Sequence, residues 1–173
     1  MEYVSSDTNV WIDFQTISRI DLPFMLPYQY IMCDESIKNE LINPPDFQQT
    51  LYEYGLIPVE LAGDEFFLAE SYGPRFPQLS IEDRIALAIA KVRNIVLLTG
   101  DGHLRKAAKE ERVPVMGTIG ILDQLYDAHY IDDSEFEKCL RELERFNGGA
   151  IRLPKSELTI RIQRISKKKD CAL

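Results

Sequence analysis

The sequence predicts an α/β fold with a central, mostly parallel sheet that carries helices on both faces. Strand-like and helix-like segments alternate along residues 1–127, which is the pattern of such sheets. Residues 95–98 form a continuous apolar run between two helical patterns, as expected of a parallel strand buried on both faces. The helical pattern before it, residues 80–93, repeats apolar residues at spacings of three and four and predicts a buried stripe.

The first half of the chain supplies two strands and a weaker third. Residues 3–6 predict a short strand, and residues 9–14 then begin a helix or a turn. Residues 28–33 are rich in β-forming side chains and predict the second strand. Residues 34–42 predict a helix that its first aspartate caps and an Asn-Pro-Pro run stops. Residues 56–61 contain a proline, which limits this strand to an edge or a strand start.

The second half continues the alternation. Residues 64–72 have an apolar face at helical spacing that a Gly-Pro pair ends. Beyond the apolar run, residues 103–111 predict a basic helix, residues 113–116 a short strand and residues 118–126 another helix.

The pattern changes after residue 129. Residues 134–146 have one apolar face and predict a helix that a Gly-Gly pair ends, whereas residues 156–165 fit either a strand or a helix. We therefore expect one domain over residues 1–127, a helical extension over residues 128–166 packed on the same domain, and a disordered tail over residues 167–173.

Composition narrows the class of protein. The chain has 173 residues, of which 45% are hydrophobic and 28% charged, so it fits a single globular domain with a substantial core. No apolar run reaches the length of a membrane span and the N-terminus lacks a signal-peptide pattern, so we expect no membrane partner. Three scattered cysteines are typical of reduced thiols in a cytoplasmic protein.

The formal net charge of −8 argues against a nucleic-acid partner, because phosphate binding usually needs a basic surface. A carboxylate cluster would account for part of this charge, and a bound metal would partly neutralise it. A basic cluster also follows Asp101 in sequence, namely Arg105, Lys106, Lys109 and Arg112. RNA therefore stays a candidate substrate.

Four acidic residues lie where a predicted strand meets a helix or within the first turns of a helix: Asp7, Glu40, Asp83 and Asp101. Asp7 and Asp101 both follow the carboxyl end of a strand, where open α/β sheets bind ligands. Carboxylates brought together raise each other's pKa unless a cation lies between them. The four acids therefore predict a Mg²⁺ or Mn²⁺ site and metal-assisted hydrolysis of phosphodiester bonds.

Each acid also has a purely structural interpretation. Asp7 could cap the helix that follows it, and Asp83 with Ser80 forms a capping-box pattern. Glu40 could be a solvated surface residue. Asp101 lies between two glycines, which indicate a tight turn near a ligand or simply a helix cap. For each acid taken alone, both interpretations stay open.

Taken together, the segments around the acids resemble the successive motifs of PIN-domain ribonucleases, which carry Asp, Glu, Asp and Asp in this order. These segments are residues 6–11, 36–41, 79–88 and 97–108. Residues 115–122 and 149–154 are similar to segments of the VapC-like toxin branch of this family. The resemblance implies a three-layer α/β/α sandwich, divalent-metal-dependent endoribonuclease activity and, commonly, the toxin role in a toxin–antitoxin pair with an antitoxin protein as partner.

The resemblance also implies residue roles. The catalytic, metal-binding acids would be Asp7, Glu40, Asp83 and Asp101. Asn9 and Thr99 would be polar neighbours that support the site. The helix after the fourth acid could contact the RNA backbone through Arg105, Lys106 and Lys109. Many relatives place a second acid beside the fourth one, whereas this chain has a glycine on each side of it. Surplus apolar helix faces are compatible with a homodimer.

Two other classes of function stay open. A binding or regulatory module with little catalysis would use the same fold, and the glycines beside Asp101 fit a degenerate site. An aspartyl-phosphate phosphatase or receiver-like protein would use Asp7, but the second aspartate that many such phosphatases need two residues later is replaced by Asn9.

Overall fold

The computed structural model describes residues 2–170, and the chain divides into two compact units. The first unit comprises Met1–Val10 and Pro27–Gly117. The second unit comprises Trp11–Leu26 and Thr118–Leu173. All four acids singled out in the sequence belong to the first unit.

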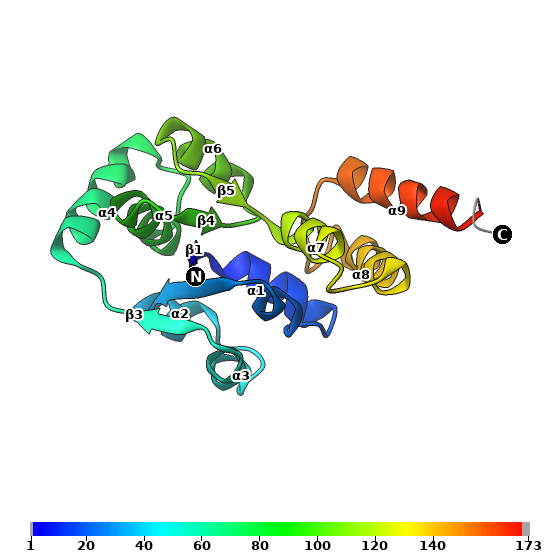
Figure 1. The fold of residues 1–173 in the computed structure, drawn as a ribbon. Helices are drawn as coiled ribbons and strands as arrows, with labels where there is room; N and C mark the ends of the chain where they lie inside the picture. The colour runs from blue at the N-terminus through cyan, green and yellow to red at the C-terminus, as the bar shows by residue number, and fades with distance from the viewer. Residues whose placement is uncertain (1, 171–173) are drawn as a thin grey trace. The chain divides into compact units, whose positions relative to one another are not determined.

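A five-stranded sheet forms the centre of the first unit, and its strand pairs are all parallel (Figure 1). The strands are β1 (Glu2–Ser6), β2 (Tyr28–Cys33), β3 (Ile57–Val59), β4 (Val96–Leu98) and β5 (Val115–Met116). Their order is β3-β2-β1-β4-β5, so β2 pairs with one side of β1 and β4 with the other. The switch point of the topology therefore lies at the carboxyl end of β1.

Helices cover both faces of this sheet. Those that lie wholly in the first unit are α2 (Asp34–Glu40), α3 (Phe47–Tyr54), α4 (Gly63–Arg75), α5 (Ile81–Arg93) and α6 (Gly102–Glu110). Residues 4–6 of β1 and residues 30–33 of β2 are all buried. Because successive strand residues point to opposite faces, this burial requires cover on both sides. The predicted α/β/α sandwich with a parallel sheet is confirmed.

Helix α5 packs against α4 and the strands β1, β2 and β4, and its residues 85–90 are all buried. The buried stripe is shorter than the sequence predicts, because Ile81 is 58% and Val92 39% exposed. Both lie in the terminal turns of α5. Sequence periodicity shows which face is apolar but not how far the neighbouring elements extend along it.

Two helix boundaries also differ from the prediction. Helix α4 continues through Pro74 to Arg75, although the ring of Pro74 removes one backbone hydrogen bond of the helix. Helix α2 begins at Asp34 as predicted but ends at Glu40 rather than at residue 42. The Asp34 carboxylate pairs with Lys38 one turn later and does not cap the helix.

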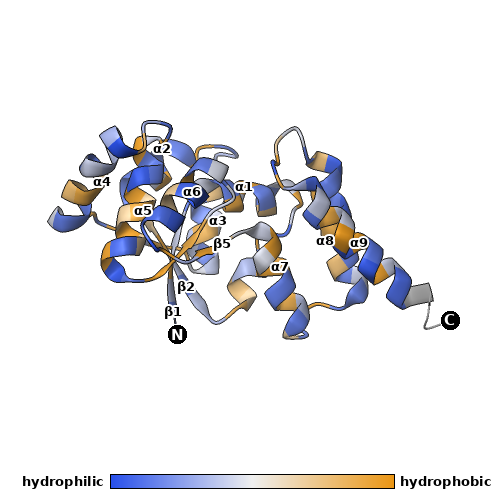
Figure 2. Ribbon diagram, turned by 90° about the horizontal axis from the view of Figure 1, so that it is seen from above, coloured by the Kyte–Doolittle hydropathy of each residue, from blue (hydrophilic) through white to orange (hydrophobic). Residues whose placement is uncertain are grey.

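The second unit is helical. It contains most of α1 (Thr8–Thr16), the 3₁₀ helix η1 (Leu22–Met25), α7 (Thr118–Asp127), α8 (Asp133–Phe146) and α9 (Lys155–Asp170). Helices α8 and α9 pack side by side, and apolar residues gather where they meet (Figure 2). The ambiguous segment 156–165 is therefore helical, with Leu158, Ile162 and Ile165 buried.

Polar contacts join the early segment of this unit to its C-terminal helices. The hydroxyl of Thr118 donates to the buried carboxylate of Asp13, and Arg19 pairs with Glu135. Residues 11–26 and 118–127 accordingly group with α8 and α9, whereas the sequence suggested a boundary near residue 127.

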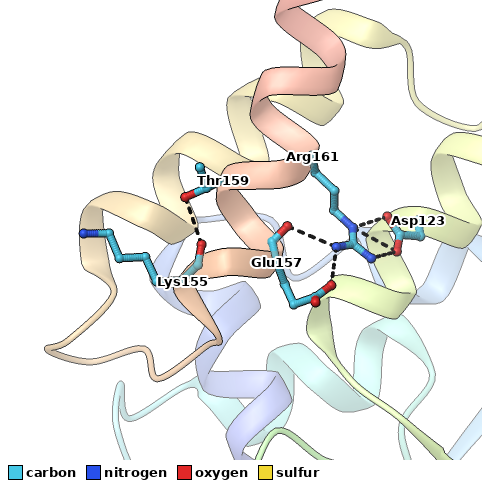
Figure 3. A network of polar contacts seen from close by, with 5 residues as sticks. All are labelled: Asp123, Lys155, Glu157, Thr159 and Arg161. Carbon is cyan, nitrogen blue, oxygen red and sulfur yellow. Dashed lines mark hydrogen bonds and ion pairs between the residues drawn. The ribbon is translucent and has the colours of Figure 1, made fainter.

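Arg161 holds α9 against α7 through Asp123 and also pairs with Glu157 of its own helix (Figure 3). Helix α9 extends to Asp170, so residues 167–170 of the expected disordered tail are helical, and Lys168 pairs with Asp133. Residues 171–173 of that tail lie outside the described residues.

Across residues 2–170, none of the helices combines the length and the apolar character needed to cross a membrane. Cys33 and Cys139 are buried free thiols. The third cysteine, Cys171, lies outside the described residues.

Candidate metal centre

Asp7 follows β1 directly, and its N–H donates to the carbonyl of Leu98 on β4 at 2.9 Å. Its buried carboxylate accepts three hydrogen bonds. Oδ1 accepts from the N–H of Thr8 at 2.7 Å, and Oδ2 accepts from Asn9 Nδ2 at 3.0 Å and from Thr99 Oγ1 at 2.8 Å. A carboxylate has about four acceptor positions, so Asp7 keeps capacity for one more ligand.

Burial is the main reason that the pKa of Asp7 rises to about 7, and the nearby carboxylates of Asp83 and Glu40 contribute smaller increases. The hydrogen bonds from Thr99 and Thr8 act against this shift, because they stabilise the charged form. Near neutral pH the Asp7 carboxyl is therefore balanced between its two protonation states.

Thr99 connects the first and fourth acids. Its hydroxyl donates to Asp7 and accepts from the N–H of Asp101 at 3.1 Å. Asp101 is the N-cap of α6, and its Oδ1 accepts from the N–H of Leu104 at 2.8 Å. The structural interpretation of Asp101 thus holds, and its second carboxylate oxygen makes none of these bonds.

Asp83 likewise forms the capping box that its sequence suggests. Its Oδ2 accepts from the N–H of Ser80 at 2.9 Å, and its own N–H donates to the Ser80 hydroxyl at 3.0 Å. Burial raises the pKa of Asp83, and so do Asp101 and Glu82. Asp83 is therefore both a helix cap and a member of the carboxylate cluster.

Glu40 ends α2 and is partly buried rather than fully solvated. Its Oε2 accepts a hydrogen bond from the hydroxyl of Thr8. Burial raises the pKa of Glu40, and the carboxylates of Glu82 and Asp83 raise it further. Thr8 thus contacts both acids, because its N–H donates to Asp7 and its hydroxyl donates to Glu40.

Two residues beside the acids were missed by sequence reasoning. Ser36 and Glu82 line a small cavity together with Asp7 and Glu40. Ser36 lies one helical turn before Glu40, and Glu82 directly precedes Asp83. These spacings were the available signal, but a serine and a glutamate on helices are common and point to no particular role.

The two glycines beside Asp101 do not need glycine for backbone reasons. Neither Gly100 nor Gly102 has a positive φ, and a Cβ at either position would meet no atom within 4 Å. The tight turn that they suggested is an ordinary strand-to-helix junction.

A groove of about 670 Å³ lies along α6 and β5 of the same unit. Its charged lining consists of Arg105, Lys106, Lys109 and Arg112. Arg105 also donates to the carbonyl of Thr99 at 2.9 Å, which connects the groove to the residue that binds Asp7. Gly117 lies against this contact, because a Cβ there would approach Arg105 Nη1 to 3.0 Å and Thr99 O to 3.2 Å.

A family model described as a PIN domain matches residues 3–167. The chain belongs to the PIN-domain family. PIN domains are generally nucleases and typically use divalent metals, so the fold is of nuclease type. No curated protein and no solved structure gave a significant match.

The donor chemistry of this PIN domain suits Mg²⁺ or Mn²⁺, since the cluster offers only oxygen atoms. Within residues 2–170, however, no group of three or more His, Cys, Asp or Glu side chains is arranged to hold a metal ion directly. The acids are near enough to shift one another's pKa, and Mg²⁺ keeps several of its waters. The residues therefore fit a cation that keeps some of its water ligands better than a fully dehydrated one.

Proposed function

We propose that this PIN-domain protein is an endoribonuclease that depends on Mg²⁺ or Mn²⁺ and hydrolyses RNA phosphodiester bonds. One observation carries the proposal: carboxylates from separate parts of the chain lie close together, so that Glu40 and Asp83 raise the pKa of Asp7, and Asp83 raises that of Glu40. Such repulsion destabilises the fold unless a cation offsets it. A site with uncompensated negative charge of this kind is suited to binding a cation.

In this proposal Asp7 and Asp101 are direct ligands, and Glu40 and Asp83 hold waters of the cation or a second ion. When bound, the metal would supply a water of lowered pKa and offset the charge that develops on the phosphate. Asn9 and Thr99 hold the Asp7 carboxylate by its Oδ2 and so limit its rotation.

The basic groove supports RNA as the substrate. Arg105, Lys106 and Lys109 project from α6, the helix that Asp101 caps, so the same element carries an acid of the site and the cationic side chains. A local basic surface can bind phosphate even though the chain is acidic as a whole.

The test is cleavage of a mixed RNA panel by the purified protein with Mn²⁺ and with chelator. Wild-type protein should cleave only with Mn²⁺, and Asp7→Asn should abolish cleavage. Asp127→Asn removes an exposed acid of the second unit and should leave cleavage unchanged. Cleavage that survives Asp7→Asn would contradict the assignment of the site.

A second candidate is a PIN-like binding or regulatory module with weak or no catalysis. The absence of a ready metal-binding group within residues 2–170 favours it, as do the glycines beside Asp101. Mn²⁺ binding separates the two candidates, because a degenerate module should bind Mn²⁺ weakly or not at all.

The toxin role, with an antitoxin protein as partner, rests on the resemblance to the VapC-like branch. Phe66 and Phe67 of α4 are 49% and 73% exposed and pack against each other, which suits a protein partner or a homodimer. The buried free thiols Cys33 and Cys139 fit a cytoplasmic location. Expression of the wild-type protein should arrest growth of the host cells, whereas expression of Asp7→Asn protein should not. Light scattering would give the oligomeric state.

A further inference from the structure

A buried serine lies beside the acids without a hydrogen-bond partner. Ser36 is 4% exposed, and its Oγ makes no hydrogen bond. Native structures pair buried hydroxyls with protein groups or with ordered water, because an unpaired one destabilises the fold. A helical serine commonly bonds to the carbonyl one turn earlier, but Ser36 makes no such bond.

The cavity that Ser36 lines is of the size of one water molecule. Its volume is about 10 Å³, close to the smallest space that holds one water. Asp7, Glu40 and Glu82 line the same space. Ser36 and Glu40 are one turn apart on α2, so both side chains lie on one face of that helix.

The lining groups match the hydrogen bonds of a single water. The Ser36 hydroxyl can donate one proton to a water oxygen, and carboxylates of Glu40 and Glu82 can each accept one from it. Three bonds is the usual number for a buried water. A water in this place would also lessen the repulsion between Glu40 and Glu82.

We propose that Ser36 is a positioning residue of the metal centre: with Glu40 and Glu82 it binds one buried water that fixes the Glu40 carboxylate for cation binding. This inference rests on the proposed function of the acid site. Glu82 thereby becomes a fifth acid of the centre, outside the four-acid motif.

Titration of the full chain with Mn²⁺ alone, followed by calorimetry, tests the role. Ser36→Ala should weaken Mn²⁺ binding about 10-fold, as the loss of groups that orient a ligand commonly does. Ser5→Ala is the matched control, because Ser5 is equally buried but its hydroxyl donates to the carbonyl of Ala86. It should lower the melting temperature and leave Mn²⁺ affinity unchanged.

The role of the fifth acid has its own control pair. Glu82→Gln should weaken Mn²⁺ binding, whereas Glu35→Gln, which removes an exposed acid from α2, should not. Ser36→Ala protein that binds Mn²⁺ like wild type and melts at a higher temperature would overturn the proposal, because Ser36 would then be only a tolerated unpaired hydroxyl.

A crystal structure of wild-type protein grown with chelator decides the same point without metal. A water bonded to Ser36 Oγ, Glu40 and Glu82 is expected. A Ser36 hydroxyl turned onto the carbonyl of Met32, with no water beside it, would overturn the proposal. Wild-type protein that binds no Mn²⁺ would instead count against the proposed function, and the position of this water would still decide the present inference.

Discussion

At Asp7, burial and hydrogen bonding act in opposite directions on one carboxylate. Burial raises its pKa from the ordinary value of 3.8 to about 7, although Thr99 and Thr8 donate to it. Folded protein therefore holds a proton on Asp7 in a pH range where the unfolded chain has lost it. Ionisation of Asp7 costs stability, and this cost is absent below about pH 4 and complete above about pH 7.

We expect metal-free protein to lose stability as the pH rises from about 4 to about 7. Asp7→Asn should remove part of this loss and raise the free energy of unfolding at pH 8 by more than about 1 kcal/mol, since one unit of pKa shift corresponds to about 1.4 kcal/mol. Urea unfolding in chelator at several pH values measures it.

Asp13 provides a comparison, because burial raises its pKa to about 6 in the other unit. Asp13→Asn should remove a separate part of the same pH dependence. If the stability of Asp7→Asn protein followed that of wild type at every pH, the raised pKa of Asp7 would be wrong.

Gly102, which follows Asp101 directly, has room for an acidic side chain. A Cβ at Gly102 meets nothing within 4 Å, and its φ is ordinary. Gly102→Asp should therefore fold, and an acid in the first turn of α6 should add about 0.5 kcal/mol of stability. It should also tighten Mn²⁺ binding in a calorimetric titration. Gly63→Asp, at an equally open glycine on α4, should leave Mn²⁺ affinity unchanged.

The sequence predicted the meeting of Asp7, Thr99 and Asp101, because β1 and β4 are strands whose carboxyl ends adjoin. It could not reveal Ser36 and Glu82. Their involvement depends on how α2 and α5 are rotated about their axes at the sheet edge, and the packing of the whole unit sets that rotation.

Among the elements, α6 depends on the same residue that we propose as a metal ligand. Asp101 caps α6 through the N–H of Leu104. Asp101→Ala should therefore lower the free energy of unfolding by about 1 kcal/mol. Asp101→Asn should keep most of the cap, because asparagine is an equally good N-cap.

Both substitutions at Asp101 should abolish Mn²⁺ binding and RNA cleavage, because both remove the charge. Chemical unfolding and Mn²⁺ titration of the two proteins separate the cap from the ligand. Asp132→Asn, at the N-cap of α8, is a control that should leave RNA cleavage intact. An Asp101→Asn protein that still cleaves RNA would show that Asp101 is a cap alone.

Element identity was largely predictable, whereas element ends were not. Every predicted strand is present, because each has a distinct β-forming or apolar run between breakers. The helix over residues 156–165 could not be distinguished from a strand, because Leu158, Ile160 and Ile162 alternate like a strand, whereas Leu158, Ile162 and Ile165 keep helical spacing. Packing against α8 decides for the helix.

For the whole molecule, the net charge of −8 lowers the affinity for RNA, whereas the basic groove raises it. We expect weak affinity at high salt and a clear salt dependence. Lys106→Ala combined with Lys109→Ala should lower the magnitude of the slope of log K against log salt by about 1.4, if each contacts one phosphate of single-stranded RNA.

Fluorescence anisotropy of labelled RNA with Asp7→Asn protein, which should not cleave it, would measure this slope. Lys138→Ala, at an exposed lysine of α8, should leave it unchanged. An unchanged slope in the double variant would place RNA on another surface.

The order of the strands also has a consequence for synthesis of the chain. β1 is made first, but its partner on one side is β4, and the hydrogen bond from Thr99 to Asp7 spans 92 residues. A nascent chain that ends before β4 leaves Asp7 without Thr99 and Asp101, so no ribosome-bound fragment of this length can carry the complete site. The proposed metal centre would thus assemble only after β4 and the residues that follow it have been translated, and chains that end before β4 should be inert.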